Sequence, residues 1–529
     1  MRPDRLAIPL QWVLANWECV VLVLLIVFYL ITAAILFQDH KIPVLNETDG
    51  VEYMLRADGP FFTIDPYHGP GYPVAVKVAK LLGLGTFNAA KLVSVFFGTV
   101  IIVVLHLIVR SFSTPAHGIV TAAITAVSPL FLFMSTAIMS DVMGAAAALC
   151  TLALLIVPDR VTRWHFAAAG ICASIAYLTR NMYAYLLVFP LVTGVLGTEK
   201  RKIKDSLVGT SIFFFAFLFF GLPWFVFIAA RTGSPVWNHN HLIVAYKVYF
   251  NASGWANFPS EADFPSWKEV VGKDFGLFVQ TWWGTVKELP QRLSGFVAGV
   301  GVLGIVGVLA WFMTMNRRKA VFLAASVGFA ALVCLVQFYA RVYFFLLAIT
   351  ASFVAAGFVL LPGRLGSPEG AGTLRRVIGA IPVRATAVVL FLILLSSDTR
   401  LLLQRERGDP PVEYREAGQW IREHSGGDDV SVMAAKPHIA FFAKAHHISF
   451  WRNGLGKADL DQLPALLAEH QPTYLVFDMR YANRYFPMLR PLGRTLREPY
   501  SDFLELVHIV RSRKRVVIYK YNGANNRSS

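Results

Sequence analysis

Long apolar stretches recur along most of the chain and are separated by short polar segments. A helix that crosses a bilayer needs about 20 mostly apolar residues, so this pattern predicts about 11 transmembrane helices. The expected spans are 17–37, 89–110, 117–134, 141–157, 165–178, 183–197, 206–230, 291–315, 320–336, 342–361 and 385–396. The spans at 165–178 and 385–396 are short, and loss of either would invert the topology that follows it. We therefore expect an all-α polytopic membrane bundle over residues 1–396, with outer loops at 38–88 and 231–290.

The pattern changes after residue 396, where helical and strand-like segments alternate. Val412–His424 has apolar residues at helical spacing, and Thr473–Asp478 is an apolar run of strand length. Further expected elements are a strand at Val430–Ala434, a short helix at 437–445, a helical leucine stripe over 460–467 and a strand at Val516–Tyr521. Residues 397–529 are therefore predicted to form a soluble C-terminal α/β domain.

The tryptophans and histidines outside the spans have ordinary structural explanations. The outer segment 231–290 contains five tryptophans, which suit a segment at the membrane interface and leave acceptor docking as the alternative. The C-terminal histidines have no partnering carboxylate or cysteine pattern. We therefore expect surface positions, and no metal site, for His438, His446 and His447.

Composition excludes a soluble enzyme and accounts for the charge. The 529 residues are 56% hydrophobic and 16% charged, with a mean hydropathy of +0.53. A net charge of +16 would suit a nucleic-acid binder, but alternating spans place the basic loops on one side. These loops contain Arg2 and Arg5, Arg160 and Arg163, Lys200–Lys204, Arg317–Lys319, and Arg364–Arg384. The positive-inside rule makes that side cytoplasmic, so we expect the N-terminus inside, the C-terminal domain outside, and membrane lipids rather than nucleic acid as partners.

Charged residues also collect where the predicted spans meet the opposite, outer face. The first outer loop contains Asp49 and His68, Asp141 opens the fourth span, Arg180 follows the fifth, and Arg341 precedes the tenth. A charge at the centre of a bilayer costs about 2.5–3.5 kcal/mol on insertion scales. Groups of both signs on one face are better explained by a water-filled cavity. We expect these residues to share one extracytoplasmic pocket.

Chemistry outside the cytoplasm limits what such a pocket can do. Because no nucleotide-sugar pool exists there, a glycosyl donor would arrive on a membrane-borne carrier such as a polyprenyl phosphate. Transfer requires a carboxylate to accept the proton of the attacking group, and cations to offset negative charge on the departing phosphate. Arginine suits the second role because its planar fork donates two hydrogen bonds to one phosphate. A carboxylate after the first span and arginines at the same face meet both needs.

Short motifs at these places resemble the GT-C class of polytopic glycosyltransferases, especially bacterial relatives of protein O-mannosyltransferases and of lipid A aminoarabinose transferases. The matching pieces keep their order over nearly the whole chain. They are Glu47-Thr48-Asp49-Gly50 with Tyr53, His68-Gly69-Pro70-Gly71-Tyr72-Pro73, Met139-Ser140-Asp141, Leu178-Thr179-Arg180, Arg341-Val342-Tyr343, and the segment from Glu413 to Trp420. The resemblance implies a membrane-embedded glycosyltransferase with a GT-C-like bundle.

The same resemblance implies a role for each candidate residue. Asp49 would be the catalytic base. The donor phosphate would be bound by Arg180, Arg341 and Tyr343. Asp141 and His68 would contact the acceptor or a divalent metal ion, which is the one candidate cofactor.

Each candidate also has a structural explanation that the sequence leaves open. Asp49 and Asp141 suit the N-caps of the helices that begin beside them. Arg180 and Arg341 suit span ends, where long cationic side chains snorkel toward water. His68 lies between Tyr and Gly and suits a turn.

The leading hypothesis is an inverting glycosyltransferase that moves a sugar from a polyprenyl-phosphate donor to an acceptor lipid, glycan or protein at the outer face of the cytoplasmic membrane. Gly50 follows Asp49 where the O-mannosyltransferases have a second acidic residue, which weakens the case for a protein acceptor. A lipid or solute transporter or flippase would favour polar mid-span residues and internal repeats, whereas these spans are apolar at their centres. A non-catalytic lipid-binding scaffold of the same fold is the other alternative.

Overall fold

The structure is a computed structural model of the chain, and it divides into two compact units. The helical unit comprises Met1–Lys41, Pro60–Asn238 and Val279–Gln404, and the mixed unit comprises Ile42–Gly59, His239–Phe278 and Arg405–Ser529. The residues described are 16–38, 48–196, 203–250, 259–294, 301–336, 344–359, 412–426, 429–450, 460–482, 486–493 and 500–523. The predicted domain boundary at residues 396 and 397 lies outside these ranges and remains a prediction.

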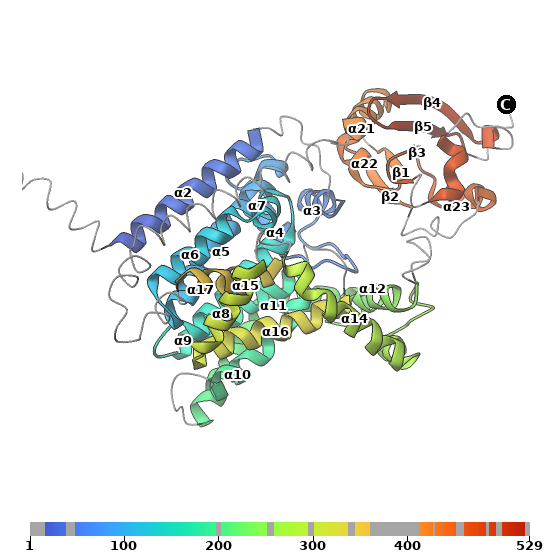
Figure 1. Ribbon diagram of the computed structural model, residues 1–529. Helices are drawn as coiled ribbons and strands as arrows, with labels where there is room; N and C mark the ends of the chain where they lie inside the picture. The colour runs from blue at the N-terminus through green and yellow to red at the C-terminus, as the bar shows by residue number, and fades with distance from the viewer. Residues whose placement is uncertain are drawn as a thin grey trace, which may run out of the picture. The chain divides into compact units, whose positions relative to one another are not determined.

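The described part of the helical unit consists of helices and short connections (Figure 1). Its first helices are α2 (Trp17–Gln38), α4 (Gly71–Lys80), α5 (Thr86–Phe112), α6 (Pro115–Val127), α7 (Pro129–Thr136), α8 (Ser140–Ile156) and α9 (Arg163–Thr179). They are followed by the 3₁₀ helix η1 (Asn181–Val188), α10 (Phe189–Leu196), α11 (Ile203–Thr232), α15 (Gly301–Met313), α16 (Arg317–Val336) and α17 (Leu347–Val359). The helix α14 (Phe275–Ser294) begins in the mixed unit and ends in the helical unit.

These helices agree with the apolar pattern of the sequence. Among the described residues, α2, α5, α11 and α16 are long and apolar enough to cross a membrane, and the bent pair α6 and α7 would make a fifth span. The described residues of each predicted span overlap one helix or consecutive helices, except for 385–396, which lies wholly outside the described residues. The total of about 11 spans therefore remains a prediction.

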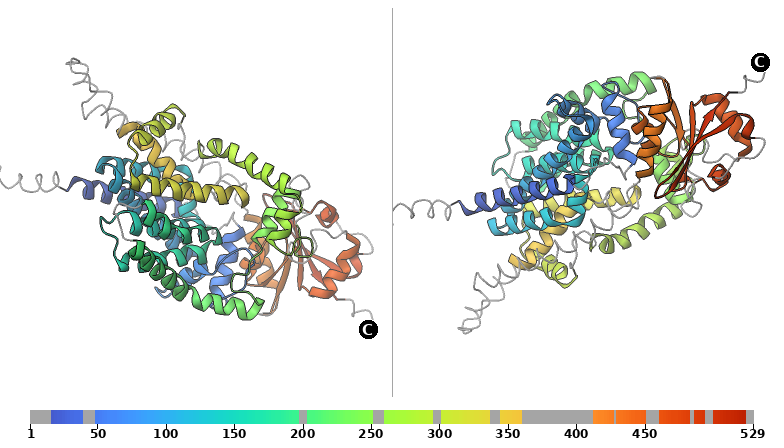
Figure 2. Two further views of the ribbon diagram at one scale, coloured as in Figure 1. Left: turned by 90° about the horizontal axis from the view of Figure 1, so that it is seen from below. Right: turned by 90° about the horizontal axis from the view of Figure 1, so that it is seen from above.

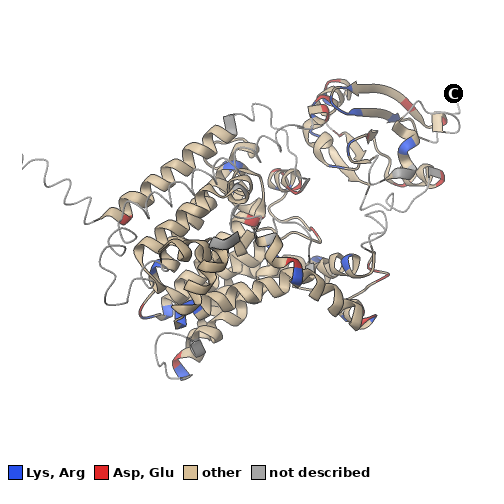
Figure 3. Cartoon of the chain, viewed as in Figure 1, with Lys and Arg blue, Asp and Glu red and all other residues tan. Residues whose placement is uncertain are grey.

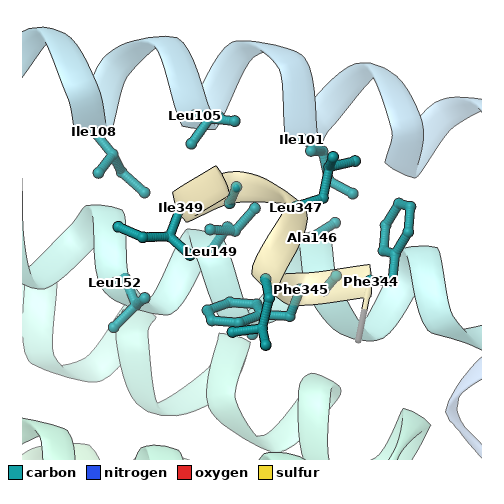
Figure 4. Close-up of a cluster of buried hydrophobic side chains, with 14 of the residues drawn as sticks. Ile101, Leu105, Ile108, Ala146, Leu149, Leu152, Phe344, Phe345, Leu347 and Ile349 are labelled. Carbon is teal, nitrogen blue, oxygen red and sulfur yellow. The ribbon is translucent and has the colours of Figure 1, made fainter. Parts of the chain in front are cut away.

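The core of the helical unit gathers where α5, α8 and the start of α17 present apolar side chains to one another (Figure 4). The residues in view include Ile101, Leu105, Ile108, Ala146, Leu149, Leu152, Phe344, Phe345, Leu347 and Ile349. Ala145–Ala148 on α8 are at most 5% exposed. Small side chains let neighbouring helices approach closely, so α8 is an interior helix of the unit.

Arg318 of α16 joins helices at one end of the helical unit. Its guanidinium donates hydrogen bonds to the carbonyl oxygen of Ser111 and to the carboxylate of Asp159, both at 2.7 Å. Ser111 lies at the end of α5, and Asp159 follows α8. Figure 3 shows that charges are sparse along the helices of this unit and that several Lys and Arg gather near helix ends. The described basic loops at 158–162 and 315–318 therefore meet at the same end.

The mixed unit contains a five-stranded sheet with the strand order β2-β1-β3-β5-β4. The strands are β1 (Ser431–Ala434), β2 (His446–Ser449), β3 (Tyr474–Asp478), β4 (Leu504–Arg511) and β5 (Arg515–Tyr521). β1 pairs in parallel with β2 and β3, while β5 is antiparallel to β3 and β4. Alternate residues of β3 enter different cores: Leu475 and Phe477 join one cluster, and Tyr474 and Val476 join another. The sheet is therefore covered on both faces.

Helices and 3₁₀ turns complete the mixed unit (Figure 2). The C-terminal ones are α21 (Val412–His424), α22 (His438–Ala443), η6 (Leu460–Gln462), α23 (Leu463–His470), η7 (Pro487–Gly493) and η8 (Tyr500–Asp502). The earlier segments contribute α3 (Thr48–Asp58), α12 (Asn240–Ala245), the π-helical η2 (Tyr246–Phe250) and α13 (Trp267–Gly272). The predicted strands at β1, β3 and β5 and the helix α21 are present, whereas β2 and β4 were not predicted.

The expected surface position of His438 is wrong. Its side chain is 1% exposed, and its ring lies 5.3 Å from that of Tyr414. His446 is exposed as expected, while Nε2 of His447 lies 3.2 Å from the carbonyl oxygen of Ala434. The sequence did not reveal that α22 packs against α21 and so encloses its first residue.

Asp478 is a buried carboxylate that holds the turn after β3. Its Oδ1 accepts hydrogen bonds from the Tyr414 hydroxyl at 2.9 Å and from the backbone N–H groups of Tyr481 and Ala482 at 2.6 and 3.4 Å. Burial raises the pKa of Asp478, although these hydrogen bonds and Lys436 oppose the rise. The fold therefore needs the Asp478 side chain as a hydrogen-bond acceptor. Ionisation of its carboxyl group, however, destabilises the folded state, because the group is buried.

We expect Asp478→Ala to lower the free energy of unfolding by about 1–3 kcal/mol, because it leaves buried donors without an acceptor. Asp478→Asn keeps an acceptor oxygen and removes the buried charge, so its melting temperature at pH 7 should stay near that of the wild type. Thermal unfolding of the full chain in detergent measures both variants. Equal losses in the two variants would show that the charge itself stabilises the fold.

Candidate functional site

Two opposite charges are buried together in the helical unit. Nη2 of Arg180 donates a hydrogen bond to Oδ2 of Asp141 at 2.7 Å, and the two side chains are 8% and 5% exposed. A charge buried to this extent persists only when it is paired and hydrogen-bonded. Asp141 and Arg180 therefore behave as one buried group.

The ends of two adjacent helices bring this pair together. α8 begins at Ser140 with Met139 as its N-cap, so Asp141 lies inside the first turn. α9 ends at Thr179, and Arg180 follows in an extended conformation. Asp141 is thus not the N-cap, and Arg180 turns toward a buried carboxylate instead of snorkelling to water. Both structural alternatives are wrong for this pair.

Two glycines let the His68–Pro73 motif pack against the end of α9. A Cβ at Gly69 would lie 1.9 Å from the carbonyl oxygen of Leu178, and a Cβ at Gly71 would lie 2.5 Å from Oγ1 of Thr179. Real Cβ atoms do not approach other atoms this closely. Two motifs separated by more than 100 residues therefore meet directly before Arg180, and only glycine permits the contact.

Asp65 and His68 form a second polar pair, in the turn before this contact. Oδ1 of Asp65 accepts hydrogen bonds from the backbone N–H groups of Tyr67 and His68 at 2.8 and 2.9 Å. Nδ1 of His68 lies 3.3 Å from the same oxygen. His68 is a turn residue, as one alternative proposed, and it also has a carboxylate partner. Asp65 was not among the sequence candidates, because an Asp before Pro reads as a turn former.

Lys91 is a cation that the sequence analysis missed. It lies near the start of α5, donates a hydrogen bond to the carbonyl oxygen of Thr136 at the end of α7, and has its Nζ 5.5 Å from the centre of the Phe87 ring. An ionisable residue within an apolar span is a functional candidate by default. The available signal was the charge of Lys91 near the start of the apolar span 89–110, whose other charged residue, Arg110, lies at its far end.

Tyr72 of α4 is hydrogen-bonded to α5. Its buried hydroxyl donates to the carbonyl oxygen of Ala90 at 2.9 Å and lies 2.8 Å from Oγ of Ser94. These contacts link α7 to α5, α5 to α4, α4 to α9 and α9 to α8, in each case near a helix end. We call Asp65, His68, Lys91, Asp141 and Arg180 the Arg180 cluster. It lies at the opposite end of α8 and α9 from Asp159, so charges of both signs meet at the predicted outer end.

The remaining candidates belong to the mixed unit or fall outside the described residues. Asp49 belongs to α3 of the mixed unit and lies within the first turn of that helix, which begins at Thr48, so it is not the N-cap. Arg341 and Tyr343 fall outside the described residues. The roles assigned to these three residues therefore remain predictions.

Some side chains of the Arg180 cluster are potential ligands for the candidate divalent metal ion. Asp65 and His68 offer a carboxylate and an imidazole 3.3 Å apart, which are ordinary ligands for a divalent ion. Asp141 is engaged by the guanidinium of Arg180. The geometry therefore favours Asp65 over Asp141 as the partner of His68 in any metal site.

We expect Gly69→Ala to disrupt the junction between the His68–Pro73 motif and α9, because the added methyl group overlaps a backbone oxygen. The loss should exceed about 3 kcal/mol of unfolding free energy or abolish folding, since backbone atoms cannot move aside cheaply. Gly85→Ala is the matched control, because a Cβ there meets nothing within 4 Å. Thermal melts in detergent compare the two, and equal stability would refute the close contact.

Comparison with known proteins adds a partial match in sequence and a match in fold. Residues 68–225 match the family model PMT_2, described as dolichyl-phosphate-mannose-protein mannosyltransferase. This stretch contains every residue of the Arg180 cluster except Asp65. No curated protein matches the chain.

Several solved structures share the fold over most of the chain. ArnT from Cupriavidus metallidurans bound to undecaprenyl phosphate aligns with a TM-score of 0.59 and 15% identity, over 94% of this chain and 97% of that chain. The apo oligosaccharyltransferase of Archaeoglobus fulgidus aligns with a TM-score of 0.61 and 13% identity, over 89% of this chain and 71% of that one. AglB from the same organism, in complex with an inhibitory peptide and a dolichol-phosphate, gives 0.57 and 14%, over 90% and 71%. The chain therefore has the fold of the GT-C glycosyltransferases, as the resemblance of its motifs predicts.

Proposed function

We propose that the chain is an inverting glycosyltransferase that moves a sugar from a polyprenyl-phosphate donor to an acceptor at the outer face of the cytoplasmic membrane. The observation that carries the proposal is the Arg180 cluster, which gathers buried and half-buried charges of both signs at one end of an apolar helical unit. Support comes from the fold, which is shared with a structure bound to undecaprenyl phosphate, and from the family match over residues 68–225.

Lys91 and Arg180 are the proposed contacts of the donor phosphate. Arg180 has five N–H donors, and the bond to Asp141 uses one end of its fork. Asp141 would thus orient the guanidinium, and the positive charges of Arg180 and Lys91 would offset the negative charge that develops on the departing phosphate. Arg341 and Tyr343 stay in the proposal on the resemblance alone. In a site with little water, such donors stabilise developing negative charge strongly.

Asp49 is the proposed general base. The acceptor's oxygen or nitrogen forms a bond to the anomeric carbon while the bond from that carbon to the phosphate oxygen breaks. The electron pair leaves with the polyprenyl phosphate, and the proton of the acceptor passes to the carboxylate of Asp49. A single displacement from the face opposite the leaving group inverts the anomeric centre. This step needs no oxidant and no covalent glycosyl intermediate.

The recipient and the metal belong to the same proposal. The acceptor in this proposal is a lipid, a glycan or a protein. Gly50, which follows Asp49, weakens the case for a protein acceptor. If a divalent ion is used, Asp65 and His68 would hold it, and the ion would supply further positive charge near a phosphate. The basic loops at Arg160 and Arg318 support a cytoplasmic location for the opposite end of the helical unit, because short cytoplasmic loops carry an excess of Lys and Arg.

Asp49→Asn should lower sugar transfer by about 10²- to 10⁴-fold, the usual contribution of a general base. Binding of undecaprenyl phosphate should remain, because the amide leaves the proposed phosphate contacts in place. The assay supplies the full chain in liposomes with a panel of undecaprenyl-phosphate-linked radioactive sugars and with envelope lipids, glycans or proteins as acceptors.

Asp58→Asn is the matched control, since Asp58 is an exposed carboxylate at the end of the same helix. Transfer at the wild-type rate by Asp49→Asn would exclude Asp49 as the base. Movement of the labelled lipid across the vesicle without sugar transfer would support the transporter alternative instead.

Lys91→Met should weaken binding of undecaprenyl phosphate by about 10- to 100-fold, because it removes a charge-assisted hydrogen bond to phosphate. Methionine keeps much of the apolar stem. Lys204→Met serves as the control, because Lys204 is exposed on α11 at the other end of the helical unit. A titration of detergent-solubilised chain with undecaprenyl phosphate measures both, and equal affinities would remove Lys91 from the site.

A further inference from the structure

The helix that carries the proposed base belongs to the mixed unit. α3 has 11 residues, and isolated helices of that length are marginally stable in water. Its Val51, Tyr53, Met54 and Ala57 are at most 2% exposed, so it is held by packing. One of its neighbours is α22 of the C-terminal α/β domain. The position of Asp49 is therefore tied to that domain.

α22 in turn takes its position from the sheet and from α21. It begins a few residues after β1, at the carboxyl end of the parallel strands. This edge is where open α/β sheets place functional groups. The helix packs against α21, and the ring of its first residue, His438, lies 5.3 Å from that of Tyr414. A shift of α21 would thus carry α22 with it.

Gly418 sets how closely α21 and α22 approach. A Cβ at this position would lie 2.5 Å from Cβ of Phe442, 2.7 Å from the carbonyl oxygen of Ile439 and 3.0 Å from the backbone nitrogen of Ala443. Two of these atoms belong to the backbone of α22, so no side-chain rotation relieves the overlap. Any larger residue at Gly418 must push α22 away from α21.

We propose that the C-terminal α/β domain is the positioning element of the base-bearing helix, acting through the chain of contacts from Gly418 on α21 to α22 and then to α3. The inference rests on the proposed role of Asp49. The domain would then contribute to the rate of sugar transfer without touching the donor phosphate. Gly418 is a positioning residue in this proposal, and α22 transmits its effect.

The test compares Gly418→Ala with Gly272→Ala in the full chain. Gly272 ends α13 in the same unit, and a Cβ there meets nothing within 4 Å. Three quantities are measured: hydrogen exchange of the amides of α3, transfer from the undecaprenyl-phosphate-linked sugar that the wild type uses, and binding of undecaprenyl phosphate. Misplacement of a catalytic group by about 1 Å lowers rates by up to about 100-fold.

Gly418→Ala should speed exchange in α3, lower the turnover number by about 10- to 100-fold and leave undecaprenyl phosphate binding unchanged, while Gly272→Ala should match the wild type in all three. If Gly418→Ala fails to fold, Ile439→Val provides a milder change, because it removes one methyl group from the buried cluster that α21 and α22 share. The same direction of change is expected for it.

The experiment distinguishes a failure of the proposed positioning role from a failure of the proposed role of Asp49 as the base. Unchanged exchange in α3, in a folded variant at Gly418 or Ile439, overturns the positioning role while leaving Asp49 as the base. Faster exchange in α3 with unchanged turnover overturns the catalytic role of Asp49, and the positioning of the base falls with it. A loss of undecaprenyl phosphate binding would show that the domain acts on the donor and would also overturn the inference.

Discussion

Asp141 and Arg180 bury opposite charges where α8 begins and α9 ends, and the rest of the Arg180 cluster is connected to this junction. Breaking such a pair by removing one partner usually costs about 3–5 kcal/mol, yet replacing both by apolar residues is often neutral or stabilising. Fold stability alone therefore does not explain why the chain keeps two charges here. A guanidinium held rigidly by a carboxylate is, however, well prepared to bind a phosphate without losing side-chain freedom.

The sequence predicted that Asp141 and Arg180 lie close together, because the alternation of the spans determines which helix ends lie at the same face of the membrane. It also named the His68–Pro73 motif, but the reason for its glycines appears only in three dimensions, where Gly69 contacts the backbone of Leu178. Lys91 was missed because one charge does not alter the apolar average of a span. A single functional residue inside an apolar span is hard to find from the sequence pattern, whereas functional residues at the boundaries of helices are easier to find.

The mixed unit shows the same limit at the level of the fold. The strands β1, β3 and β5 are apolar runs, and the sequence predicted them. β2 has only one apolar residue, Ile448, and depends on backbone pairing with β1. β4 is irregular between Leu506 and His508, so its alternation is interrupted. Nor does any local pattern show that α3 groups with a domain more than 350 residues later in the chain.

The proposed base and the proposed phosphate contacts belong to different units, and this division predicts how substitutions would affect the proposed reaction. The proposed phosphate contacts Lys91 and Arg180 belong to the helical unit, which has its own core, while Asp49 belongs to the unit built on the sheet. A substitution that loosens one core acts on one group of residues first. Changes in the helical unit should then appear mainly in donor affinity, and changes around α22 mainly in the turnover number, since binding and proton transfer use different residues. A fold with one shared core would not separate the two effects, because every destabilising change would alter both.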